Sequence, residues 1–139
     1  MLELKGLKKL FKGISVLNGV DISIKQGTKI GLSGGNGTGK STLLNIATGF
    51  LTPEEGAIIL NGDNITHFEA WKFARLGVKR TFQKVRFNEA LILKEQLYTS
   101  EAIINRNLDM LKDAGLIDYL YAFPNEVPLP ILRKVEVIR

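Results

Sequence analysis

The chain has 139 residues, of which 45% are hydrophobic and 24% charged, a composition that suits one soluble globular domain. It contains no cysteine, which excludes a disulfide framework and thiolate metal sites, and it has no run of about 18 apolar residues that could cross a bilayer. The formal charge of +5, from 19 Lys and Arg against 14 Asp and Glu, favours anionic partners such as nucleotides, nucleic acids or lipid headgroups.

Short β-rich runs and turns are expected up to about residue 66. The apolar patterns predict strands at residues 2–4, 20–24, 29–32 and 57–60. A helix over residues 40–48 interrupts these strands, and Gly49 is its expected C-terminal stop. The Asn61-Gly62 pair predicts a hairpin, because both residues tolerate the positive φ that tight turns require.

Beyond residue 67 the pattern becomes mainly helical. It predicts a helix over 68–76, a strand over 78–82 and helical segments over 95–122 that break around Gly115. Three prolines then predict an extended or irregular stretch: Pro124, Pro128 and Pro130. We therefore expect two parts, an α/β core over residues 1–83 and a helical part over residues 84–139.

A phosphate-binding loop follows the predicted strand at 29–32. The pattern G-x-x-x-x-G-K-[ST] is met in full by Gly34, Gly35, Asn36, Gly37, Thr38, Gly39, Lys40 and Ser41. The glycines let successive backbone N–H groups face one anion, and the N-terminus of the following helix adds the positive end of its dipole. Lys40 would reach the β- and γ-phosphates, Ser41 would ligate Mg²⁺, and Thr42 would hydrogen-bond near the α-phosphate.

Other stretches around this loop resemble the ATP-binding subunits of ABC transporters, in the family's order and over essentially the whole chain. The similarity is carried by residues 10–17, 41–49, 53–56, 60–62 and 77–83, the last being closest to transporters of the branched-chain amino acid and urea type. The resemblance implies an α/β P-loop NTPase fold, with a RecA-like core, an antiparallel β flank and an incomplete helical subdomain. It also implies that Phe11 stacks on adenine, that Val16 packs against the ring edge, and that Gln83 contacts Mg²⁺ or the attacking water.

The resemblance implies a transport ATPase domain that binds ATP and Mg²⁺ and energises the movement of a small polar solute. Its partners would be transmembrane permease subunits and a second nucleotide-binding domain, and no nucleic acid is expected. Residues 84–97, including Phe87, Glu89 and Leu91, would line the surface that docks the permease. The chain would then be cytoplasmic and peripheral on the inner face of the cell membrane, held there through its partners.

The chain departs from the family pattern in its second half. Residues 133–139 resemble the helix after the LSGGQ signature, but the signature positions fall on 127–131, which lack its serine and glycines. The sequence stops before a Walker B strand with its Asp and Glu and before a switch His, and His67 lies too far upstream to replace that histidine. We therefore expect little or no ATP hydrolysis by this chain alone, and self-association through partly uncovered parallel strands.

Three functions stay open on the sequence. The first is the transport ATPase domain or its amino-terminal piece, and the second is a nucleotide-binding or interaction module that releases no phosphate. The third is a soluble ABC protein that acts on ribosomes or DNA, for which the charge of +5 is weak support. The lysines of the first thirty residues form no aromatic-interleaved patch, and this weighs against nucleic acid.

Overall fold

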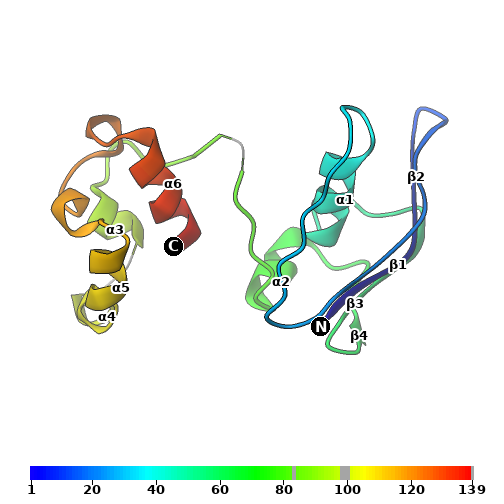
Figure 1. The fold of residues 1–139 in the computed structure, drawn as a ribbon, viewed down its shortest axis with the longest axis horizontal. Helices are drawn as coiled ribbons and strands as arrows, with labels where there is room; N and C mark the ends of the chain where they lie inside the picture. The colour runs from blue at the N-terminus through cyan, green and yellow to red at the C-terminus, as the bar shows by residue number, and fades with distance from the viewer. Residues whose placement is uncertain (83, 98–100, 139) are drawn as a thin grey trace. The chain divides into compact units, whose positions relative to one another are not determined.

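The computed structural model describes residues 1–82, 84–97 and 101–138, which form two compact units, Met1–Arg80 and Thr81–Arg139 (Figure 1). The first unit contains β1 (Leu2–Phe11), β2 (Ile14–Ile24), α1 (Lys40–Ala47), β3 (Glu55–Leu60), β4 (Asp63–Asn64) and α2 (Ala70–Arg75). The second contains α3 (Leu93–Leu97), α4 (Glu101–Arg106), α5 (Leu108–Asp113), η1 (Ile117–Tyr119), η2 (Pro124–Glu126) and α6 (Leu129–Ile138). The expected division into functional parts at residues 83 and 84 stays a prediction.

An antiparallel sheet in the order β2-β1-β3-β4 forms the first unit's β flank. In the central strand, Leu4 lies opposite Ile22 of β2 and opposite Ile58 of β3. Leu4 and Leu7 are both buried although their spacing of three would place them on opposite faces of a regular strand. The register shift between these two residues resolves the conflict, because the extra residue of a β-bulge turns the chain by one face.

Gly56 allows β3 to stay paired with β1 beside this bulge. Its φ is +96°, and a Cβ atom at this position would lie 2.4 Å from the carbonyl oxygen of Lys5. A side chain there would force β1 and β3 apart, so the close strand pairing depends on glycine.

Both helices of the first unit lie on the same side of the sheet (Figure 1). They contribute Leu43 and Ile46 from α1 and Phe73 from α2 to one buried cluster. Its other members come from the strands and the segment after β4: Leu4, Leu7, Leu17, Ile58 and Ile65. Burial of each such side chain stabilises the fold by about 1.5–3 kcal/mol, so this cluster holds α1 and α2 against the sheet.

The turn and helix predictions for this unit are confirmed. Asn61 and Gly62 have φ values of +53° and +100° and join β3 to β4, with Leu60 opposite Asp63. The helix predicted over 40–48 is α1, and Gly49, with φ of +74°, follows its last turn. The helix predicted over 68–76 is α2.

The strands predicted at 29–32 and 78–82 are wrong for this structure. A β-strand needs a neighbouring strand for its backbone groups, and in the described ranges no strand pairs with residues 29–32. Ile30 is accordingly 55% exposed. In the second segment the backbone groups have other partners: Val78 N–H donates to the carbonyl of Phe73, and Phe82 N–H donates to the carboxylate of Glu136.

The second unit is helical and has its own core. Eight buried side chains form it: Leu93, Leu97, Ile104, Leu111, Leu116, Leu120, Val127 and Val135. The break predicted at Gly115 is confirmed, since this residue, two positions after the end of α5, has φ of +66° and its N–H donates to the Lys112 carbonyl. The helices in the described ranges lack the length and hydrophobicity that a bilayer-spanning segment requires.

The proline-rich stretch is more helical than predicted. Pro124 begins η2, and Pro130 is the second residue of α6. Proline is tolerated in the first turn of a helix because the N–H group it lacks has no partner there. The prediction of an irregular segment is wrong because Pro124 and Pro130 lie in the first turns of helices, where proline is tolerated, and do not interrupt a helix.

Candidate nucleotide-binding site

The predicted phosphate loop leads directly into α1 and lies at the same end of the first unit as the β1–β2 turn (Figure 1). The first bond of α1 runs from Leu43 N–H to the Gly39 carbonyl, at 2.8 Å. The N–H groups of the preceding residues therefore have no acceptor within the helix. The first turn carries no acidic side chain, so the positive end of the helix dipole faces the loop without an anion of its own.

Gly39 is in close contact with β2. It has φ of +85°, and a Cβ atom here would lie 2.8 Å from the Val16 carbonyl oxygen and 3.1 Å from its Cγ1. Only glycine combines this backbone angle with this approach. Val16, expected beside the nucleotide, is thus placed next to the loop, half-buried near the start of β2.

Lys40 is folded over the loop. Its Nζ donates to the carbonyl oxygens of Gly34, at 2.7 Å, and Gly35, while the Thr38 hydroxyl donates to the same Gly35 oxygen at 2.9 Å. No carboxylate forms an ion pair with this ammonium in the described part of the chain. Its positive charge is therefore held by neutral oxygens of the loop that the sequence predicts to bind phosphate.

The remaining loop residues lie around this point. Gly37 and Asn36 are exposed in the turn, Ser41 is exposed in the first turn of α1, and Thr42 is half-buried beside it. The described residues contain no cluster of three or more His, Cys, Asp or Glu that could hold a metal ion. The Ser41 hydroxyl is thus the one predicted magnesium ligand that the structure describes, because Gln83 lies outside the described residues.

Phe11 ends β1, opposite Ile14, and is 43% exposed. Lys9 approaches its ring, with Nζ 5.5 Å from the ring centroid. The same ammonium bonds to Glu54 Oε1 at 2.8 Å and to the Thr52 carbonyl at 2.9 Å. These bonds fix the cation beside the aromatic ring, and the hydrogen bond from Lys9 lowers the pKa of Glu54. No sequence pattern indicated this arrangement, because its partners are far apart along the chain.

Arg80 makes a second connection that no local pattern indicated. Its guanidinium donates to Asn45 Oδ1 and, at 3.4 Å, to Thr48 Oγ1, at the C-terminal end of α1. It also lies 5.5 Å from the centroid of Phe50. The segment that leads toward Gln83 is therefore attached to the same helix that carries Lys40 and Ser41.

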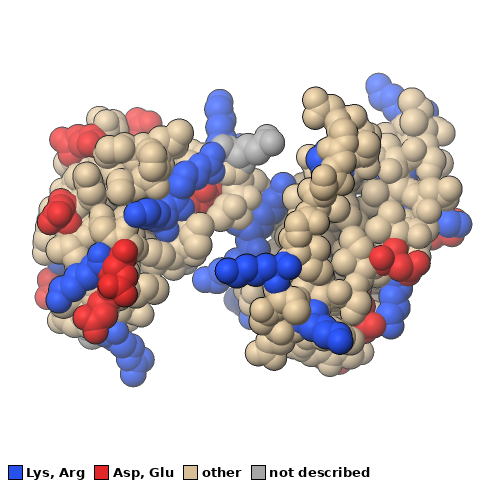
Figure 2. All heavy atoms as spheres, viewed as in Figure 1, with Lys and Arg blue, Asp and Glu red and all other residues tan. Residues whose placement is uncertain are grey.

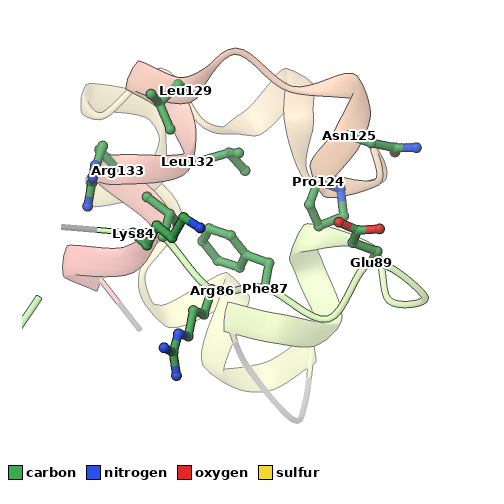
Figure 3. Close-up of a pocket in the computed structure, with 10 residues that line it drawn as sticks. Lys84, Arg86, Phe87, Glu89, Pro124, Asn125, Leu129, Leu132 and Arg133 are labelled. Carbon is green, nitrogen blue, oxygen red and sulfur yellow. The ribbon is translucent and has the colours of Figure 1, made fainter. Parts of the chain in front are cut away.

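The second unit contains a cleft of about 660 Å³ (Figure 3). Its described lining residues are Lys84, Val85, Arg86, Phe87, Glu89, Pro124, Asn125, Leu129, Leu132 and Arg133. The Phe87 ring points into the cleft, whereas the Arg86 guanidinium points away from it (Figure 3). Of the three residues expected at a permease surface, Phe87 and Glu89 line the cleft and Leu91 does not.

Comparison with known proteins identifies the family. The sequence model of the ABC transporter family matches residues 17–127. The high-affinity branched-chain amino acid transport ATP-binding protein BraF of Pseudomonas aeruginosa is 38% identical over 108 residues, which cover 77% of this chain and 42% of BraF. The ribose import ATP-binding protein RbsA 1 of Agrobacterium fabrum is 34% identical over 119 residues, 86% of this chain and 22% of that protein. The chain thus spans less than half the length of these relatives.

A solved structure agrees with this assignment. The ADP conformation of MJ1267, an ATP-binding cassette of an ABC transporter, has a TM-score of 0.88 at 26% identity. The match covers 99% of this chain and 63% of that one, and it confirms the predicted α/β P-loop NTPase fold class. With the complete phosphate-loop motif at the start of α1 and the family match over residues 17–127, the chain belongs to the ABC transporter family and represents part of its nucleotide-binding domain.

Proposed function

We propose that this chain binds MgATP through residues 34–42 and is part of an ATPase that powers solute import through permease subunits. The observation that carries the proposal is the geometry of the loop. Gly39 brings the loop against β2, and Lys40 is held there by the carbonyl oxygens of Gly34 and Gly35 and by the Thr38 hydroxyl. Similarity to BraF supports a branched-chain amino acid as the solute.

Each loop residue has one task in this proposal. Lys40 exchanges two carbonyl oxygens for phosphate oxygens, which are better partners for an ammonium because they carry charge. The free N–H groups at the start of α1 bind the same phosphates. Ser41 offers its hydroxyl to Mg²⁺, which neutralises phosphate charge when it is bound. Phe11 stacks its exposed ring on adenine.

Binding without hydrolysis is the second candidate for this chain by itself. Phosphoryl transfer to water needs acidic groups that hold the metal and orient the attacking water. In the described ranges no acidic cluster accompanies the loop. Hydrolysis then depends on groups supplied from outside the residues that the structure describes.

The cleft of the second unit is the proposed permease surface. It combines an apolar centre at Phe87 and Leu132 with the cations Lys84 and Arg133 and the carboxylate of Glu89, so it suits a segment that is partly apolar and partly charged. A second nucleotide-binding domain is the other proposed partner. Through the permease, the protein would lie on the cytoplasmic face of the membrane.

Calorimetric titration with MgATP tests the nucleotide site. Lys40→Ala should weaken binding by about 100-fold or more, because it removes a charge-assisted contact to the phosphates. Lys25→Ala is the matched control, since Lys25 is exposed just after β2, away from the loop sequence. Phosphate release measured on the same samples distinguishes the two candidates.

Three results separate the possibilities. Binding that depends on Lys40 without phosphate release supports the binding-only form of this chain, and turnover that depends on Lys40 supports the ATPase. Equal affinities of the native chain and Lys40→Ala would show that the loop is not the phosphate site.

A further inference from the structure

A cluster of aromatic and basic side chains covers the outer side of α2. We call it the α2 outer face and define it as Phe68, Trp71, Lys72 and Arg75. Trp71 and Arg75 lie four residues apart on α2 with Lys72 beside them, and Phe68 comes two residues before the helix begins, whereas Phe73 of α2 is fully buried in the core. Phe68 is 40% exposed and Trp71 is 51% exposed.

The rings and the cations of this face contact one another. Lys72 Nζ lies 5.3 Å from the ring centroids of both Phe68 and Trp71, and the Arg75 guanidinium carbon lies 4.9 Å from that of Trp71. The Trp71 indole N–H donates to the carboxylate of Glu69. The face is therefore an ordered arrangement, in which cations are held over aromatic rings.

The charge of this face is not neutralised within the described chain. Neither Lys72 nor Arg75 forms an ion pair with a carboxylate there, and Glu69, the acid next to the face, accepts from the indole N–H and offsets only one of these two positive charges. Figure 2 shows basic side chains over the part of the first unit where Figure 1 places α2. The partner that complements this face must combine negative charge with a region that accepts aromatic rings.

We infer that the α2 outer face binds the surface of an anionic lipid bilayer. Tryptophan and phenylalanine are favoured at the boundary between headgroups and acyl chains, and lysine and arginine are attracted to anionic headgroups. The arrangement provides both on one exposed helix side. This contact would belong to the chain itself and needs neither nucleotide nor permease, so it goes beyond the proposed function and can be tested separately from it.

Trp71 is the only tryptophan in the sequence, so its fluorescence reports directly on this face. The full chain is titrated with phosphatidylcholine vesicles, with and without about 30% phosphatidylglycerol, in low and high salt. We expect emission to shift to shorter wavelength with the anionic vesicles. Partitioning into them should be about tenfold stronger or more than into neutral ones, and salt should weaken it. Brominated acyl chains should quench the emission.

Two charge-matched variants locate the contact. Lys72→Glu with Arg75→Glu should abolish binding to the anionic vesicles, whereas Lys25→Glu with Lys29→Glu, which changes the net charge equally at exposed positions before the loop, should retain most of it. Should the first variant fail to fold, quenching of native Trp71 by brominated lipid still decides the matter.

Four outcomes would overturn the inference. The first two are unchanged Trp71 emission on addition of vesicles and equal partitioning into neutral and anionic vesicles. The third is an emission change with a single-stranded oligonucleotide but not with vesicles, and the fourth is an emission shift that depends on protein concentration without lipid. The third would identify a nucleic-acid surface, and the fourth a contact with a second copy of the chain.

Discussion

Two glycines of the phosphate loop have almost the same backbone angle but different surroundings. Gly37 has φ of +80°, and a Cβ atom added there would have no neighbour within 4 Å. Gly39 has φ of +85°, and its Cβ atom would face the Val16 carbonyl oxygen at 2.8 Å. The two positions therefore separate the cost of the angle from the cost of the contact.

We predict that Gly37→Ala costs about 1–2 kcal/mol of unfolding free energy, from the left-handed backbone alone. Gly39→Ala should cost clearly more, because the new methyl also displaces the loop from β2, and it should weaken MgATP binding further. Urea denaturation and calorimetry on both variants provide the measurements. Equal losses would mean that the approach to Val16 does not constrain the loop.

At the scale of elements, α1 and α2 meet where α1 ends. A Cβ atom on Gly49 would lie 2.5 Å from Cδ2 of Phe73, a side chain that is fully buried. Gly49 thus ends α1 and also makes room for the main apolar side chain of α2.

We predict that Gly49→Ala and Phe73→Leu are each destabilising, the first through backbone angle and steric overlap, the second through lost packing. The double variant should be more stable than the sum of the two losses indicates, by about 1 kcal/mol, because the smaller leucine leaves space for the new methyl. A double-mutant cycle by chemical denaturation measures this coupling. Strict additivity would show that the two residues do not share the space.

At the scale of the molecule, each unit has a carboxylate whose pKa is lowered by a lysine. Hydrogen bonding by Lys9 lowers the pKa of Glu54 below its ordinary value of 4.5, and hydrogen bonding by Lys94 does the same for Glu101. The ionised form of each carboxyl group is favoured in the folded state, so these two groups stabilise the folded state above pH 4.5. Their contribution is lost as the pH falls through the lowered values.

We predict a loss of stability below pH 4.5 that is modest, because both carboxylates are exposed. Glu54→Gln and Glu101→Gln should each reduce the loss of stability at low pH. The pH range over which the remaining carboxylates lower the stability should stay the same. Thermal unfolding between about pH 3 and 7 is the measurement. Unaltered pH profiles in both variants would assign the acid sensitivity to other carboxylates.

Local signals were sufficient for much of the fold and for identifying the phosphate-loop motif. The glycines at 49, 62 and 115 and the apolar spacing of α1 and α2 act within a few residues, and the structure confirms the turns and helices they predict. The loop motif and the family could also be recognised from the sequence, because the motif is a continuous segment of the chain.

Contacts between distant segments could not be predicted from local sequence signals. The bonds of Arg80 to α1 and of Lys9 to Glu54 join residues far apart in sequence, and nothing local distinguishes these cations from other exposed ones. The same reason explains the two wrong strands, since a strand exists only where another chain segment supplies its hydrogen-bond partners. The sequence by itself determined the family, the phosphate-loop motif, whose role stays a prediction, and the local turns. Only the tertiary structure decided which apolar runs pair as strands, which cations surround the site and which aromatic side chains stay exposed, because those outcomes depend on groups brought together by packing.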